Sequence, residues 1–321
     1  MKRSILLVAI SLFICMLFTS CGRAYKEESF FCMDTFATVK VDTSDVNIIN
    51  RCRELLDNLD KELSRHNING KTAEFNASLK GGELSKNILE LIYISQNITK
   101  QTDGTFSVFS GALTSLWSEA AVYPSSEKIK NAVDSIDFEP KINGNILEKN
   151  NADTKLEFGG IAKGYACDKA IELLKNDGVS SGMVSFSSSI GVIGKNPDGN
   201  SWRIAVKNPI DTDKILGYIS LEDGFLSVSG DYERHYEIDG EKYNHIIDIK
   251  SGLPVNHGIH SVVVVAKSGA LCDALSTAFF VMGEEAVAEK YADSLSVQYL
   301  IVSDNGIFIN ESMKKIYTKA E

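Results

Sequence analysis

The spacing of apolar residues changes near residue 155, from the period of helices to the alternation of short strands. Before that point, apolar residues recur every three or four positions over 46–64 and 84–99, which predicts two amphipathic helices, and Pro124-Ser125 is typical of the start of another. After it, β-branched runs alternate with turn residues, and Asp239-Gly240 predicts a hairpin. The pattern predicts an α+β fold: a mixed, mostly antiparallel sheet core with packed helices.

Local patterns refine this outline. Residues 30–41 are expected to form the first strand, and residues 155–158 a strand that leads through a glycine turn into a helix. The run SVVVVA at 261–266 is typical of a strand covered on both faces, and 272–282 predicts a helix after it. No repeat or low-complexity linker divides residues 30–321, so we expect one closely joined domain there.

The first 21 residues have the features of an export signal that ends at a lipidated cysteine. A positively charged start precedes an apolar run at 5–18, which is too short for a comfortable membrane span, and a small residue then precedes Cys21 as in a bacterial lipobox. We expect a lipoprotein signal peptide over 1–21 and a polar tether over 22–29. Acyl chains on Cys21 would then hold the mature protein on the outer face of the bacterial cytoplasmic membrane.

Charge and cysteine usage narrow the function further. The 321-residue chain has a formal net charge of −10, which argues against nucleic acid as a partner because phosphate backbones need a basic surface. There is no CxxC motif, so zinc and thioredoxin-type chemistry are not expected. Cys52, Cys167 and Cys272 lie among apolar residues in helical patterns and are expected to be buried free thiols.

Asp273 and Thr277 form a candidate metal-binding pair. They are four residues apart on the helix predicted at 272–282, so their side chains share one face. A carboxylate and a hydroxyl are hard oxygen ligands, and Mg²⁺ takes about this many from a protein when phosphate oxygens and waters complete its shell. Alternatively, Asp273 caps the helix and Thr277 bonds back to a carbonyl.

Two further features are candidates for chemistry. His245 lies near Asp248 at the end of an aromatic-rich strand, and could titrate near neutral pH and act as a base, although a structural role is an equal alternative. GGIAKG at 159–164 joins a strand to a helix, so its glycines let the backbone approach a ligand, the helix start favours phosphate, and Lys163 adds a cation. A plain strand-to-helix turn would leave the same pattern.

Four segments, taken in order, resemble the ApbE family: MDTFATVKV (33–41), LEFGGIAKGYACD (156–168), SVSGDYERHYEIDGEKYNHIIDIKSGLP (227–254) and CDALSTAFFVMG (272–283). These proteins are exported, often lipid-anchored FAD:protein FMN transferases. The resemblance implies an ApbE-like domain over 30–321 that cleaves FAD at its pyrophosphate with Mg²⁺. It also implies transfer of FMN, as a phosphoester, to a threonine or serine of an exported or membrane electron-transfer protein, with release of AMP.

Carried over position by position, the resemblance also implies site residues. The metal would be held by Asp273, Thr277 and the backbone carbonyl of Gly160, and His245 would be the base that activates the acceptor hydroxyl. The FAD site would be lined by Met33, His66 (where the family usually has Tyr), Thr105, Phe106, Ser107, Glu157, Lys163 and Ile247.

The chain departs from the family pattern at four places. Ser107 and Val108 stand for Asp and Pro, Ser187 to Ser189 for a Gly-Gly-Asp/Asn turn, Val228 for the Thr of TSG, and Ile249 for the Pro of HIIDP. These changes leave other functions open. The protein could be an FAD diphosphatase that gives FMN and AMP, a non-catalytic FAD-binding lipoprotein, or a structural or adhesion lipoprotein.

Overall fold

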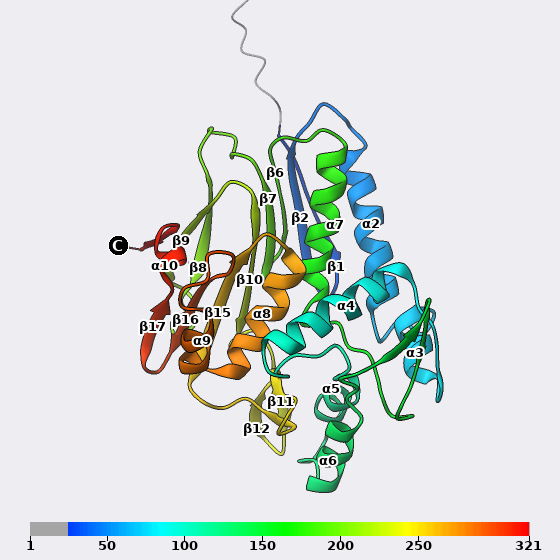
Figure 1. Ribbon diagram of the computed structural model, residues 1–321. Helices are drawn as coiled ribbons and strands as arrows, with labels where there is room; N and C mark the ends of the chain where they lie inside the picture. Colours follow the sequence, from blue (N-terminus) through cyan, green and yellow to red (C-terminus); the bar gives the residue numbers. More distant parts are fainter. Residues whose placement is uncertain (1–24, 321) are drawn as a thin grey trace, which may run out of the picture.

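An eight-stranded sheet organises the computed structural model, which describes residues 25–320 (Figure 1). Its order is β1-β2-β6-β7-β10-β15-β16-β17, and every neighbouring pair is antiparallel. These strands are β1 (Tyr25–Cys32), β2 (Thr35–Asp42), β6 (Gly182–Phe186), β7 (Ser189–Ile193), β10 (Gly224–Gly230), β15 (Ile259–Ala266), β16 (Gln298–Ser303) and β17 (Gly306–Ile309).

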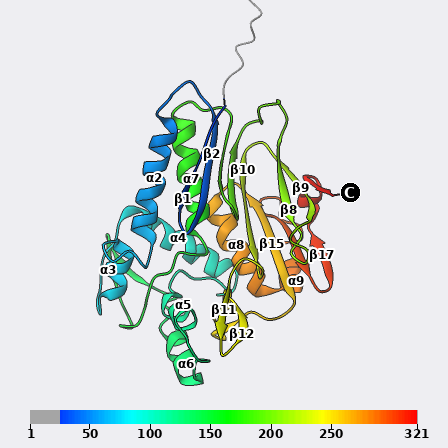
Figure 2. The same cartoon turned by 180° about the vertical axis from the view of Figure 1, so that it is seen from behind.

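Most of the helices lie on one face of this sheet (Figures 1 and 2). The described helices are α2 (Ile48–Leu63), α3 (Lys71–Ala77), α4 (Lys86–Gln101), α5 (Gly111–Ser118), α6 (Ser126–Asp134), α7 (Ala162–Asn176), α8 (Gly269–Met282), α9 (Glu284–Tyr291) and α10 (Glu311–Lys314). Of these, α7 packs on β6 and β7, and α8 packs on β10 and β15.

Four smaller sheets complete the described strands. They are β18-β9-β8 (Tyr317–Lys319, Ile215–Leu221, Trp202–Lys207), β3-β5-β4 (Gly81–Glu83, Ile146–Glu148, Lys141–Asn143), β11-β12 (His235–Ile238, Glu241–Asn244) and β13-β14 (Ile247–Asp248, Leu253–Pro254). The pairings are antiparallel in all four. The predicted α+β fold with a mostly antiparallel sheet core is therefore confirmed.

The strand β15 lies between two apolar layers, as its run of valines predicts. Val262 and Val264 belong to the cluster formed with the helices, whereas Val263 and Val265 belong to a second cluster with Trp202 and other residues of β8 and β9. Because successive side chains of a strand point to opposite faces, an uninterrupted β-branched run fills both layers. The sheet is therefore the middle layer of three, and α8 is held against its most apolar strand.

Three expectations for local structure are wrong. Residues 30–41 form a hairpin rather than one strand, since Met33 and Asp34 both have positive φ (52° and 58°) and turn the chain between β1 and β2. The expected tether over 22–29 is strand β1 from Tyr25 onwards. Residues 155–158 form no ladder: Lys155 makes an isolated parallel bridge with Ser110.

Two other expectations concern the start of the chain and the cysteines. The expected signal peptide over 1–21, with Cys21, lies outside the described residues. Within 25–320, no helix is both long enough and apolar enough to cross a membrane.

Cys52, Cys167 and Cys272 are buried and free, as expected, and so is Cys32. Burial raises the pKa of both Cys167 and Cys272 well above the ordinary thiol value, so these thiols stay protonated and unreactive.

Candidate functional site

A cavity of about 1120 Å³ opens where the β1–β2 turn, the end of α2, the glycine turn before α7, and α8 meet. Residues from six or more separate segments of the chain line this cavity. Such an arrangement is expected of a ligand-binding site rather than of a shallow depression in the surface. Every residue that the resemblance assigns to metal, FAD or catalysis is among them: Met33, His66, Thr105, Phe106, Ser107, Glu157, Gly160, Lys163, His245, Ile247, Asp273 and Thr277. The fold therefore brings all twelve positions to one place.

The crossing of α7 and α8 positions Asp273. Gly164 on α7 and Gly269 on α8 touch through their backbones: a methyl group added at Gly164 would lie 2.0 Å from the Gly269 carbonyl oxygen. This approach lets the Gly164 amide donate to Asp273 Oδ2 at 3.0 Å. On the other side, Ser189 Oγ donates to Asp273 Oδ1 at 3.2 Å and accepts from Ser227 Oγ at 3.1 Å. The carboxylate is 3% exposed, and its direction is fixed from both helix and sheet.

The alternative that Asp273 caps α8 is wrong. Ser268 is the N-cap and accepts from the Leu271 amide, while Asp168 of α7 accepts from the amides of Gly269 and Ala270 at 2.6 and 2.9 Å. The second part of that alternative, a hydrogen bond from Thr277 back to a carbonyl, is confirmed: Thr277 Oγ1 donates to the Asp273 carbonyl at 3.3 Å. A hydroxyl that donates backwards still presents its oxygen lone pairs to the cavity.

Gly160 lies against Thr277, one member of the Asp273–Thr277 pair. A methyl group added at Gly160 would be 3.3 Å from Thr277 Oγ1 and 3.2 Å from the Phe106 ring, so the backbone at Gly160 packs closely against both side chains. Together these residues offer only hard oxygen atoms. Within residues 25–320 no group of three His, Cys, Asp or Glu side chains could enclose a metal ion. The donor set fits Mg²⁺ that takes its remaining ligands from phosphate oxygens and water.

A partly buried ion pair holds the glycine turn. Glu157 Oε1 accepts from the Gly159 amide at 2.8 Å, and Glu157 Oε2 meets Arg65 Nε at 2.6 Å. Arg65 also donates to Ser115 Oγ and Ser118 Oγ on α5, so each nitrogen of its guanidinium has a partner. The turn that these contacts fix leads into α7, whose Lys163 reaches back to the Gly159 carbonyl at 3.2 Å.

His245 is held as a neutral ring beside the cavity. Its Nδ1 lies 2.9 Å from the Arg234 carbonyl oxygen, which can only accept, so Nδ1 carries the proton and Nε2 keeps its lone pair. Burial, with the nearby charges of Arg234 and Lys163, lowers the pKa of His245 to about 4. The expectation that it titrates near neutral pH is therefore wrong. Asp248 is not its partner either, because Asp248 accepts from the amides of Lys250 and Ser251 in the next turn.

The remaining predicted residues form the walls. The 105–107 segment is fixed by hydrogen bonds from Thr99 Oγ1 to the Phe106 carbonyl and from Thr105 Oγ1 to the Thr102 carbonyl. Ser107, which replaces the family's aspartate, accepts from the Phe109 amide. Met33 sits in the β1–β2 turn with its amide donating to Asp60 Oδ2 at 3.0 Å. His66 is exposed at the rim, and Ile247 is buried in β13.

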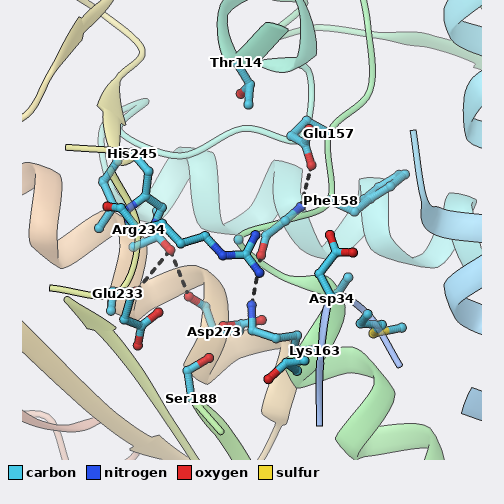
Figure 3. A pocket seen from close by; sticks show the side chains of 18 of the residues that line it. Asp34, Thr114, Glu157, Phe158, Lys163, Ser188, Glu233, Arg234, His245 and Asp273 are labelled. Atoms are coloured by element: carbon cyan, nitrogen blue, oxygen red, sulfur yellow. Dashed lines mark hydrogen bonds between the residues drawn. The ribbon is translucent and has the colours of Figure 1, made fainter. Parts of the chain in front are cut away.

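Several charged residues of the cavity have no role in the sequence prediction, and Arg65, Glu233 and Arg234 are among them. Figure 3 shows Arg234 and Lys163 reaching into the same space, with Glu157 on one side and Asp273 and Glu233 on the other. Burial raises the pKa of Glu233, while Lys163 and Arg234 lower it. Glu233 and Arg234 lie within the quoted 227–254 segment, but Arg65 has no sequence signal, because only the folded chain brings it to Glu157.

Comparisons with known proteins agree with this geometry. A sequence model described as the ApbE family matches residues 33–301. The FAD:protein FMN transferase of Vibrio cholerae is 31% identical over 280 residues, which cover 83% of this chain and 83% of that protein. The protein of the same name from Escherichia coli K12 is 27% identical over 266 residues, covering 79% and 76%.

Solved structures give the same result. The chain is similar to the ApbE protein of Thermotoga maritima, with a TM-score of 0.83, 29% identity and coverage of 93% of this chain and 100% of that one. It is also similar to the flavin transferase ApbE of Vibrio cholerae, with a TM-score of 0.82, 26% identity and coverage of 91% and 99%. A family match over most of the chain and a shared fold lead to one conclusion: this chain belongs to the ApbE family.

Proposed function

We propose that this protein is a Mg²⁺-dependent FAD:protein FMN transferase. The observation that carries the proposal is the convergence of Gly160, Asp273 and Thr277 at the wall of a cavity that also holds a cation, Lys163, and a neutral histidine, His245. The cavity volume of about 1120 Å³ has room for a dinucleotide. The names of the curated relatives support the same reaction.

Gly160, Asp273 and Thr277 would hold the ion, and bound Mg²⁺ would neutralise charge on the pyrophosphate. Asp273 is suited to this role because the Gly164 amide and Ser189 hydroxyl fix its direction before any ligand arrives. Lys163 would add a positive charge beside the phosphates, at the start of α7. In a phosphoryl-type transfer, such positioning and charge neutralisation supply most of the rate.

His245 would accept the proton of the acceptor hydroxyl at Nε2. The hydroxyl oxygen of a threonine or serine then forms a bond to the phosphorus of the FMN half of FAD. At the same time the bond from that phosphorus to the bridging oxygen breaks, and AMP leaves with the electron pair on that oxygen. The Arg234 carbonyl keeps the Nδ1 proton in place throughout, so that Nε2 remains the acceptor.

The acceptor and the location of the protein belong to the same proposal. We propose that the acceptor is an exported or membrane electron-transfer protein, and that acyl chains on Cys21 tether the enzyme on the outer face of the cytoplasmic membrane. The charge, apolar run and cysteine at the start of the chain support this location.

One assay tests the reaction. The protein is incubated with FAD, Mg²⁺ and a threonine-bearing acceptor, while AMP is quantified and the acceptor mass is measured. AMP together with an acceptor that has gained FMN is the expected result. AMP with free FMN and an unmodified acceptor would show a diphosphatase, and bound FAD without any AMP would show a flavin carrier. Either of the last two results would overturn the proposed transfer.

A further inference from the structure

His260, at the start of β15, lies between two carboxylates from different parts of the chain. Its Nδ1 is 2.9 Å from Asp231 Oδ2, in the segment after β10, and its Nε2 is 3.0 Å from Asp304 Oδ1, in the turn between β16 and β17. The histidine side chain is only 22% exposed. None of the three residues lines the cavity, so the cluster is separate from the groups already described.

The two contacts determine the protonation state of the ring. An ionised carboxylate accepts hydrogen bonds only, and a neutral imidazole carries a single N–H. Both ring nitrogens of His260 can therefore donate only when the ring is protonated. Loss of that proton leaves a nitrogen lone pair facing a carboxylate on one side, and that contact then becomes repulsive.

The Asp231 contact lies at the base of a cavity wall. The Asp231 amide donates to the His260 carbonyl at 3.1 Å, so backbone and side chain both attach this point to β15. The next five residues, 232–236, line the cavity. Among them is Arg234, whose carbonyl oxygen accepts from Nδ1 of His245 and so sets which nitrogen of that ring can accept a proton. Two residues, Tyr232 and Glu233, lie between the Asp231 anchor and the Arg234 carbonyl.

We propose that protonated His260 is a positioning residue that, through Asp231, fixes the 231–236 wall and thereby the Arg234 carbonyl that orients His245. The proposal rests on the proposed function in that His245 is taken as the base. It makes the orientation of His245 depend on a second histidine that never touches substrate.

The charged groups around His260 come from two elements. Asp231 and Asp304 are the ones that contact the ring, and Asp304 is itself fixed by its amide donating to the Gly258 carbonyl at 2.9 Å. Glu284, at the start of α9, accepts from Asn305 and Ser303 beside the same turn. The two carboxylates raise the pKa of His260 against the opposing effect of burial. The contact is thus present while His260 is protonated, and is lost as pH rises through that raised pKa.

Nitrogen NMR of the full-length protein labelled at its five histidines tests the proposal without relying on transfer. Below its transition His260 should show two protonated ring nitrogens. As the pH rises through that transition, the Nδ1–H signal of His245 should shift or broaden at the same pH, because the wall that holds the Arg234 carbonyl is released. A His245 signal that stays unchanged through the His260 transition would overturn the proposal.

Variants make the test specific. In His260→Gln the His245 signal should be altered at every pH. Asp304→Asn keeps the Asp231 contact and removes one carboxylate, so the coupled transition of both histidines should move to lower pH. The matched control is His257→Gln, since His257 is an exposed histidine whose ring lies beside the Val281 carbonyl and Phe280, outside the cavity; it should change nothing at His245. A transition that does not move in Asp304→Asn would also overturn the proposal.

Kinetics give a second readout. In the wild type, kcat/KM for FMN transfer should fall on the alkaline side with the same midpoint as the NMR transition of His260. By analogy with misplaced catalytic groups elsewhere, the fall should be about 10- to 100-fold. In His260→Gln the alkaline fall should disappear because the rate is low throughout. An alkaline fall that persists unchanged in this variant would contradict the proposal, whereas absence of transfer at all pH values would count against the proposed function and leave the NMR result decisive for His260.

Discussion

The Gly164 amide donates to Asp273 Oδ2 at 3.0 Å, across the contact between α7 and α8. The same contact brings Gly164 and Gly269 together so closely that neither position has room for a methyl group. The packing of α7 on α8 therefore also positions the proposed metal site: the glycines that let the two helices approach each other place the carboxylate of Asp273. Changes at either glycine should affect stability and activity together.

Gly164→Ala should destabilise the protein by about 3 kcal/mol or more, since the new methyl group would lie 2.0 Å from a backbone oxygen that cannot move aside cheaply. Denaturant unfolding followed by circular dichroism measures the change. Gly82→Ala is the matched control, because a methyl group there meets nothing within 4 Å; it should change the free energy of unfolding by less than about 1 kcal/mol. Equal effects of the two substitutions would refute the close approach of the helices.

Asp273→Asn should lower the rate of AMP release by about 100-fold or more while the protein stays folded. The amide oxygen of asparagine can still accept from the Gly164 amide, so the helix crossing is kept, but the negative charge that would hold the metal is lost. Single-turnover AMP release at limiting Mg²⁺ measures the effect, and thermal unfolding checks the fold. Full activity under these conditions would remove Asp273 from the metal site.

Arg65→Gln should weaken FAD binding by about tenfold, because it leaves Glu157 as an unpaired carboxylate facing an anionic ligand. The double variant Arg65→Gln with Glu157→Gln should recover part of that loss, since the uncompensated charge is gone. Flavin fluorescence titration measures the Kd.

Arg53→Gln is the control for charge alone: Arg53 lies on α2 with an exposed side chain paired to Glu28 and Asp57, and it does not line the cavity. It should leave the FAD Kd unchanged. If the double variant binds FAD no better than Arg65→Gln, then Arg65 acts on the ligand directly rather than by neutralising Glu157.

The acid side of the pH profile should be set by His245. Its folded-state pKa of about 4 lies below the ordinary histidine value, so the ring remains neutral and able to accept a proton at all pH values above about 4. The rate of FMN transfer should therefore stay level as pH falls from 7 to about 5 and drop only near pH 4. Folding stability depends on pH in the same direction. The stability contributed by His245 is fully present above the pKa of histidine in the unfolded chain, and it is lost as the pH falls towards the lower pKa of His245 in the folded protein.

A transfer rate measured in buffers of constant ionic strength tests this directly. His245→Gln should be slow at every pH and show no acid transition of its own. An acid transition in the wild type centred between pH 6 and 7 would show that the ring is solvated and protonated more readily than its surroundings indicate.

Elements with a strong local pattern could be predicted from the sequence, and elements defined by distant contacts could not. The valines of β15 predict a strand covered on both faces, and the structure has apolar layers on both sides of it. The turn at Met33 and Asp34 was missed because neither residue is a glycine, although both have positive φ. The strand expected at 155–158 fails because its backbone pairs with the 108–111 loop, as in the Gly111 amide to Lys155 carbonyl contact.

The candidate site shows the same division. The four-residue spacing of Asp273 and Thr277 is visible in the sequence because both lie on one helix. The role of Gly160 came only from the resemblance, and Arg65 could not be found at all, because it meets Glu157 across 92 positions of sequence. Asp248 is near His245 in the sequence, but in the structure its carboxylate accepts from the backbone amides of Lys250 and Ser251 in the turn after β13.

The stoichiometry of AMP release against FMN attachment tests the central claim most directly. With FAD, Mg²⁺ and a threonine-bearing acceptor in single turnover, one AMP should appear for each acceptor that gains FMN, and Asp273→Asn should suppress both products equally. AMP release without acceptor labelling, or labelling that persists undiminished in Asp273→Asn, would contradict an enzyme that splits FAD at this site and passes FMN to a protein hydroxyl.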